Sequence, residues 1–290
     1  MAASIEDLVA LLDLETIDLN LFRGGQLVTE RPRVFGGQVA AQALVAAART
    51  CSSELAAHSL HLYFLRPGDT TVPIIYDVDP VRDGRSFATR RVLARQHGRP
   101  IFTMTASFQI HEEGFEHQDE MPTAPPPEEC VDPIALLTAE KEEEGGAAHY
   151  WLKEWAGTEV RFIGDSRRGG LPASDKHPAR AAYWFRVNGS LPDDPLIHQA
   201  ALTYMSDMTL LHTSVLPHTG AALESAVQAA SIDHALWFHR PFRADEWLLF
   251  TQRSPSASGA RGLIFGQFFT QTGILVASAA QEGLIRPKRL

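Results

Sequence analysis

The chain has 290 residues, a length that suits two compact domains better than one. Its 26 Lys and Arg residues are outnumbered by 35 Asp and Glu residues, so the formal net charge is −9. A chain this acidic is a poor general nucleic-acid binder, because such binding depends largely on neutralising phosphates. Hydrophobic residues make up 44% of the sequence and charged residues 21%, which excludes disorder as the main state.

Cysteine usage and the termini bear on where the chain works. Cys51 and Cys130 are too few for a disulfide framework and lack metal-site spacing, so we expect a reducing, cytoplasmic compartment. The start of the chain lacks the basic and apolar regions of a secretory signal. The last three residues resemble a peroxisomal tripeptide only weakly, because Lys288 stands where a small residue is wanted.

The first half is predicted to form one buried helix followed by strands. Residues 37–50 (GQVAAQALVAAART) are Ala-rich and apolar nearly all round, which predicts a helix covered on every side. An aromatic strand, LHLYFLRP, then ends at Arg66-Pro67. Residues 72–79 and 102–110 alternate apolar and polar side chains, the pattern of a half-buried strand.

The middle of the chain has the composition of a linker. It holds several prolines and acidic runs such as Glu142-Glu143-Glu144, which favour an extended, solvated segment. We therefore predict a first domain over residues 1–115, an acidic, proline-rich linker over 116–157, and a second domain over 158–290.

The second half repeats this order. Residues 193–215 (DDPLIHQAALTYMSDMTLLHTSV) predict a long helix, capped by Asp193 or Asp194 and ended by Pro217. The aromatic strand HALWFHRP follows. The remaining predicted strands are residues 246–252, 262–270 and 273–281. The uncharged stretch 262–281 is long enough to raise the question of a membrane span, but its glutamines and turn residues favour a hairpin.

Landmarks in the two halves are equally spaced. From Pro67 to the turn at Gly98 is 31 positions, and from Pro241 to the turn at Gly273 is 32. Together with the shared element order, these intervals predict an internal duplication. We predict an α+β fold with two helix-wrapped antiparallel sheets joined edge to edge, an arrangement known as a double hotdog.

Most signatures of enzyme chemistry are absent. The sequence has no Walker loop, no GxGxxG motif and only a partial match to a GxSxG elbow, at residues 84–88. His234 and His239 are five apart on a predicted strand, so they face opposite sides and would not share a metal. We predict no metal and no cofactor.

One carboxylate is a candidate general base. Asp207 lies in the second predicted helix, and its same-face neighbours are Thr203, Tyr204, Leu210 and Leu211. Such neighbours desolvate a carboxylate and raise its proton affinity, although a solvent-facing or Arg-paired Asp would give the same pattern. Ser231 and Gln281, at predicted strand ends, each offer a donor and an acceptor, and with one carboxylate they could hold a water.

Motifs along nearly the whole chain carry a family resemblance. They are residues 33–38 (RVFGGQ), 42–44 (QAL), 59–61 (SLH), 64–68 (FLRPG), 83–87 (DGRSF), 207–208 (DM), 232–241 (IDHALWFHRP), 256–262 (SASGARG) and 277–283 (ASAAQEG). In combination these motifs resemble the acyl-CoA thioesterase II family (TesB-like).

The resemblance implies a double hotdog that hydrolyses fatty acyl-CoA to free fatty acid and CoA. It implies a catalytic Asp on the second helix, a Thr or Ser at the start of the aromatic strand, and a Gln at the end of the last strand, positions occupied here by Asp207, Ser231 and Gln281. The family commonly has Thr where this chain has Ser231. We expect these residues to activate a water directly without an acyl-enzyme, and helix N-terminal amides, such as those of Gly36-Gly37, to stabilise the oxyanion.

Acyl-CoA is the expected partner, with no nucleic acid and no membrane, and a homodimer or homotetramer is the expected assembly. Candidate arginines for the CoA phosphates are Arg66, Arg82, Arg85, Arg240, Arg243 and Arg261, most of which would serve equally as surface charges. Trp237, Phe238 and Phe242 could line an acyl tunnel or simply pack in the core.

Three other functions remain open from the sequence. A hotdog enoyl-CoA hydratase would use the Asp233-His234 pair, although neighbours on a strand point to opposite faces. A non-catalytic acyl-CoA-binding module would share the fold without the chemistry. A serine hydrolase would use Ser231 as its nucleophile.

Overall fold

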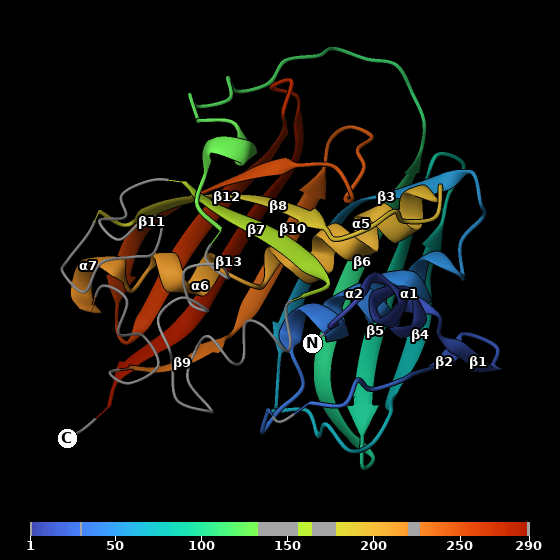
Figure 1. Cartoon of the computed structure of the whole chain (residues 1–290). Coiled ribbons are helices and arrows are strands. Elements are labelled where there is room, and N and C mark those ends of the chain that lie inside the picture. Colours follow the sequence, from blue (N-terminus) through green and yellow to red (C-terminus); the bar gives the residue numbers. More distant parts are fainter. Residues whose placement is uncertain (1, 30, 133–155, 164–177, 220–226, 289–290) are drawn as a thin grey trace.

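The computed structural model describes residues 2–29, 31–132, 156–163, 178–219 and 227–288. Within these ranges the strands form a single antiparallel sheet, and α1, α2 and α5 lie on one of its faces (Figure 1). The helices are α1 (Ile5–Leu12), α2 (Gly36–Ala48), α5 (Pro195–Ser206), α6 (Leu210–Thr213) and α7 (Leu216–Thr219), with a short 3-10 turn, η1 (Pro127–Glu129).

The strands divide between the two halves of the chain. Those of the first half are β1 (Glu15–Asp18), β2 (Leu21–Gly24), β3 (Leu55–Phe64), β4 (Ile74–Asp83), β5 (Phe87–Gln96) and β6 (Arg99–Ile110). Those of the second half are β7 (Thr158–Ile163), β8 (Arg180–Val187), β9 (Val227–Ser231), β10 (Asp233–Phe238), β11 (Leu248–Ser258), β12 (Arg261–Thr270) and β13 (Leu275–Pro287).

The sheet has the same strand order in both halves. Its order is β1-β2-β4-β5-β6-β3-β10-β13-β12-β11-β8-β7, and β9 pairs with β13 outside this path. The halves meet where β3 pairs antiparallel with β10, with Leu60 opposite Leu236. Read outward from that junction, β3, β6, β5, β4, β2 and β1 are matched by β10, β13, β12, β11, β8 and β7. The repeated order supports the internal duplication that the sequence predicts.

The predicted strands are present with shifted ends. Residues 102–110 lie in β6, and 262–270 lie in β12. The uncharged stretch 262–281 forms most of β12, a turn and the first part of β13, which is the predicted hairpin. Gly98 and Gly273 adopt φ values of 71° and 86° in the two equivalent turns, a conformation that favours glycine. No helix in the described ranges is long and apolar enough to cross a membrane.

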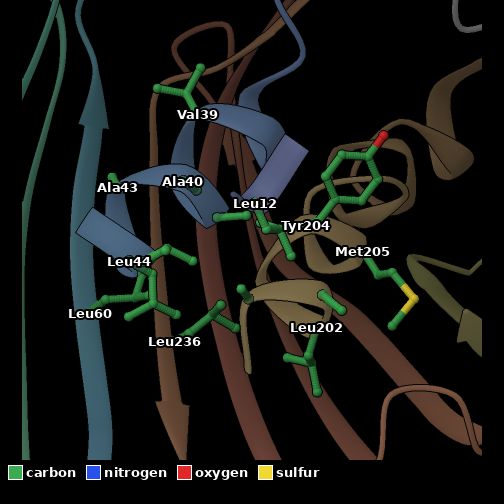
Figure 2. Close-up of a cluster of buried hydrophobic side chains, with 14 of the residues drawn as sticks. Leu12, Val39, Ala40, Ala43, Leu44, Leu60, Leu202, Tyr204, Met205 and Leu236 are labelled. Atoms are coloured by element: carbon green, nitrogen blue, oxygen red, sulfur yellow. The ribbon is translucent and has the colours of Figure 1, made fainter. Parts of the chain in front are cut away.

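Helix α2 is the buried helix predicted from residues 37–50. Every residue from Gly37 to Ala47 is buried, because small alanine side chains let the helix approach the sheet and α5 closely. Figure 2 shows Leu44 of α2 beside Leu60 and Leu236 of the central strands, and none of these three side chains is exposed. Burying each contributes about 1.5–3 kcal/mol, so this contact fixes α2 against the junction of the halves.

Helix α5 is shorter than predicted. It begins as expected, because the Asp194 carboxylate caps it by accepting the Leu196 N–H at 2.9 Å. It ends at Ser206 rather than Val215, and Pro217 lies inside the separate helix α7. Side chains just beyond Ser206 bind other elements: the Thr209 hydroxyl accepts from Gln252 Nε2 at 2.5 Å. These tertiary hydrogen bonds replace the continuation of the helix that the apolar pattern favours.

Part of the predicted linker packs on the sheet face opposite α2 and α5. Met121, Ala124 and Cys130 contact a second apolar cluster that includes Trp184 and Trp247. The indole of Trp184 donates to the carbonyl of Pro125 at 2.9 Å. The described start of this segment is therefore docked rather than fully solvated, while residues 133–155 lie outside the described residues.

Candidate active site

The three candidate catalytic side chains meet at one carboxylate oxygen. Gln281 Nε2 donates to Asp207 Oδ1 at 2.6 Å, and Ser231 Oγ donates to the same oxygen at 3.0 Å. The residues come from the end of α5, the end of β9 and the interior of β13. The fold thus brings together groups that the sequence places far apart.

The local setting of each residue differs from the prediction. Asp207 caps the C-terminus of α5 instead of lying mid-helix, because α5 stops at Ser206. Ser231 ends β9, and Ile232 separates it from the aromatic strand β10 that it was predicted to start. Gln281 lies inside β13, which continues to Pro287 rather than ending at the glutamine.

The environment of Asp207 gives it the proton affinity of a base that works near neutral pH. Burial raises its pKa from 3.8 to about 6, and this is the largest effect. Hydrogen bonds from Gln281, Ser231 and the Gly37 backbone, together with the charge of Arg33, lower the pKa and partly offset the burial. The carboxylate is therefore ionised above about pH 6 yet can accept a proton readily.

Asp207 lies against the first turn of α2, in the other half of the chain. A Cβ on Gly36 would stand 2.5 Å from Asp207 Oδ2, and one on Gly37 would stand 2.4 Å from the Tyr204 carbonyl. Only glycine permits both approaches. Because the Gly37 N–H hydrogen bonds to Asp207, this amide serves the candidate base rather than standing open for an oxyanion.

Two acceptors around Asp207 remain open. Gln281 uses its amide nitrogen for Asp207, and its buried Oε1 has no hydrogen-bond partner among the described residues. Ser231 commits its single hydroxyl proton to Asp207, so its oxygen can only accept from a further group. A buried polar atom without a partner is uncommon in folded proteins, and here it points to a bound molecule that donates hydrogen bonds.

Arg33 is a contributor that the sequence analysis did not single out. Its Nη2 donates to the carbonyl of Ala229 at 2.9 Å, which ties the segment before α2 to β9 two residues from Ser231. Its charge also lowers the pKa of Asp207. Position in the RVFGGQ motif was the only signal for it in the sequence.

Several of the arginines considered for CoA phosphates already have partners. Arg243 binds Asp193 and Asp245, and Arg261 lies 3.1 Å from Glu282. Arg66 and Arg240 donate to backbone carbonyls. These contacts fit surface structure better than an open phosphate site.

The aromatic residues and histidines fall into separate environments. Phe238 stacks on Phe242 with centroids 6.4 Å apart, but Trp237 faces the opposite side of the sheet and contacts His61, so the three cannot line one tunnel. His234 contacts Ser206, and His239 contacts Ser278. No cluster of metal-ligating side chains occurs among the described residues.

Comparison with known proteins identifies the family. Residues 173–284 match the acyl-CoA thioesterase family, and residues 28–109 match the acyl-CoA thioesterase N-terminal domain. The chain is 41% identical over 288 residues to Acyl-CoA thioesterase 2 of Haemophilus influenzae, covering 99% of each sequence. This chain belongs to the acyl-CoA thioesterase family.

Solved structures agree on the fold of this acyl-CoA thioesterase family member. The structure of the acyl-CoA thioesterase II TesB2 from Mycobacterium marinum matches with a TM-score of 0.81 at 44% identity, over 97% of this chain and 98% of that one. A hot dog fold protein of unknown function from Alicyclobacillus acidocaldarius matches with a TM-score of 0.76 at 22% identity, over 97% of this chain and 98% of that one. The second likeness supports a hotdog fold.

Proposed function

We propose that this chain is an acyl-CoA thioesterase that hydrolyses fatty acyl-CoA to free fatty acid and CoA. The observation that carries the proposal is the convergence of Gln281 and Ser231 on Asp207, whose burial raises its pKa to about 6. The names of the relatives supply the substrate class. A thioester carbonyl is electrophilic enough to be attacked by a water that is oriented and deprotonated, and these three side chains would supply the groups that orient and deprotonate it.

In the proposed mechanism a water donates one hydrogen bond to Asp207 and its other hydrogen bond to the open Oε1 of Gln281, while the Ser231 hydroxyl holds the carboxylate through its own hydrogen bond. A lone pair of the water then faces the thioester carbon. As the water oxygen forms its bond to that carbon, Asp207 takes the proton and the carbonyl becomes an oxyanion. Collapse breaks the C–S bond, and the proton on Asp207 passes to the leaving CoA sulfur. No covalent acyl-enzyme forms.

The finer structural expectations belong to the same proposal. We propose a double hotdog with domains at residues 1–115 and 158–290, joined by the linker 116–157, and the matching strand order of the two halves supports it. A cytoplasmic location and a homodimeric or homotetrameric assembly complete the proposal.

The contacts of Asp233 and His234 do not favour the hydratase alternative. Asp233 accepts from the Glu282 N–H, whereas His234 contacts Ser206 within the core. The two side chains thus bind different elements on opposite faces of the sheet and do not face one substrate together.

Release of free thiol from acyl-CoA tests the function directly. We expect purified protein to release CoA thiol from a panel of short, medium and long acyl-CoAs, and to leave the double bond of an enoyl-CoA unhydrated. Tight acyl-CoA binding without thiol release would favour the binding module. Covalent labelling of Ser231 by a fluorophosphonate would instead support a serine hydrolase, and we expect no labelling.

A further inference from the structure

We propose that Asp233 and His234 are positioning residues, which hold the backbone beside Gln281 and beside Asp207 so that both side chains converge with Ser231. This inference rests on the proposed function of the same site. The two residues lie two and three positions after Ser231 in the sequence, with Ile232 between. Neither touches the reacting atoms in the proposed mechanism.

Asp233 fixes the residue after Gln281. Its Oδ1 accepts the backbone N–H of Glu282 at 2.7 Å. The Ile232 N–H donates to the Glu282 carbonyl at 2.9 Å, so the backbone N–H and the carbonyl of Glu282 are both bound by residues 232–233. The backbone on the C-terminal side of Gln281 is therefore held by two hydrogen bonds.

His234 fixes the residue before Asp207. Its Nε2 lies 2.9 Å from Ser206 Oγ, and that hydroxyl donates its only proton to the Thr203 carbonyl at 2.8 Å. Ser206 must therefore accept, and His234 Nε2 carries the proton of a neutral imidazole. Burial lowers the pKa of His234 to about 3, which agrees with this neutral form. The bond joins the last residue of α5 to β10, and both side chains are buried.

A bulge allows Ser231 and His234 to point to the same face. Ser231 lies opposite Gly283, and Ala235 lies opposite Ala280, so four steps on one side match three steps on β13. In a regular strand, residues three apart face opposite sides. The extra residue within 232–234 turns the chain so that Ser231 reaches Asp207 while His234 reaches Ser206. The hydrogen bond from the Glu282 N–H to the Asp233 carboxylate spans this bulge.

The segment 231–234 thus contributes one member of the site and holds the backbone beside the other two. Ser231 donates to Asp207, Asp233 binds the residue after Gln281, and His234 binds the residue before Asp207. Displacement of a catalytic group by about 1 Å can reduce a rate about 100-fold, so the loss of either tie would matter.

The test compares variants that remove each tie with variants that retain it. His234→Leu keeps the bulk of the side chain but loses the donor, whereas His234→Gln retains an N–H. Asp233→Ala loses the acceptor, whereas Asp233→Asn retains an oxygen. We expect His234→Leu and Asp233→Ala to lower kcat at least about tenfold with KM changed less than about twofold, and His234→Gln and Asp233→Asn to recover most of kcat.

His239→Leu is the matched control. His239 follows β10 directly, and its Nε2 lies 2.9 Å from Ser278 Oγ on β13, a more exposed His–Ser contact at the same distance that includes none of the partners of Asp207. We expect its kcat to match that of the wild type. A further readout is the pKa of the Asp207 carboxyl, followed by ¹³C NMR. It should rise in His234→Leu and Asp233→Ala, because weakened hydrogen bonds from Gln281 and Ser231 lower it less.

A double variant separates positioning from general damage. In an Asp207→Asn background, His234→Leu should cause little further loss of kcat, because the group that it positions is already gone. An undiminished kcat in both His234→Leu and Asp233→Ala, or an Asp207 pKa that stays at the wild-type value, would overturn the inference. Absence of thiol release by the wild-type protein would overturn the proposed function instead, and the NMR titration would still test the positioning role.

Discussion

Gln281 Nε2 donates to Asp207 Oδ1 at 2.6 Å, although 74 positions separate the two residues in the sequence. The bond uses the nitrogen of the amide and leaves its carbonyl oxygen buried without a partner among the described residues. Both lone pairs of that oxygen are therefore available to accept hydrogen bonds from a water. The direction of this one bond is therefore central to the proposed chemistry.

The pH dependence of hydrolysis should show a single acidic limb. Asp207 acts as a base only when ionised, and its pKa is raised to about 6. We expect kcat/KM to rise about tenfold per pH unit below about pH 6 and then to level off. Initial rates of thiol release across this range give the profile. A limb near the ordinary aspartate pKa, about 4, would argue against a buried base.

Loss of the Asp207 charge should stabilise the protein in a pH-dependent way. The folded chain binds the Asp207 proton more tightly than the unfolded chain, because the pKa rises from 3.8 to about 6 on folding. Wild-type stability therefore falls as pH rises from about 4 to about 6. We expect the free energy of unfolding of Asp207→Asn, relative to wild type, to increase by up to about 3 kcal/mol over that window.

Denaturant titrations of both proteins at several pH values measure this difference. Because the comparison is between pH values, any pH-independent effect of the new amide cancels. A constant difference between variant and wild type would show that the carboxyl titrates alike in the folded and unfolded chains.

A methyl group at Gly36 should displace the Asp207 carboxylate and so lower kcat, although it removes none of the three candidate catalytic side chains. An added Cβ would stand 2.5 Å from Asp207 Oδ2 and 2.8 Å from the Phe64 ring, so the carboxylate or the helix must move. We expect Gly36→Ala to lower kcat about 10- to 100-fold. Gly25→Ala is the matched control, because a Cβ there meets nothing within 4 Å, and it should be close to wild type. Equal kinetics for the two variants would contradict the observed packing.

The size of the effect at Ser231 distinguishes its two possible roles. If Ser231 only donates to Asp207, Ser231→Ala loses a hydrogen bond to a charged group, worth about 1.5–3 kcal/mol, and kcat falls about 10- to 150-fold. Loss of a serine nucleophile costs about 10⁶-fold. Ser231→Thr keeps the hydroxyl and should retain most activity. Steady-state kinetics of both variants decide between these outcomes.

Local sequence patterns predicted helices and turns correctly where the pattern allowed a single interpretation. The alanine-rich residues 37–50 have no competing interpretation, and they form the buried helix α2. The equal spacing from Pro67 to Gly98 and from Pro241 to Gly273 anticipated the matching turns of the two halves. The neighbours of Asp207 left both a desolvated and a solvent-facing or Arg-paired carboxylate open, and its raised pKa agrees with the first.

The sequence could not show where tertiary hydrogen bonds overrule a local pattern. The apolar residues Leu210 and Leu211 continue the helical pattern past Asp207, but contacts of Asp207 and Thr209 with the sheet end α5 at Ser206. The bulge within residues 232–234 has no local signature, because it depends on how these residues pair with β13. From the residues alone Ser231 and Gln281 were ordinary polar side chains, and only the family resemblance assigned them to the site.

The turnover of Asp207→Asn tests the central proposal most directly. With saturating acyl-CoA near pH 8, where the wild-type carboxylate is ionised, removal of a positioned general base should lower the rate of thiol release about 10²–10⁴-fold. The variant should remain folded and should still bind acyl-CoA. Near-wild-type turnover by folded Asp207→Asn would contradict the account.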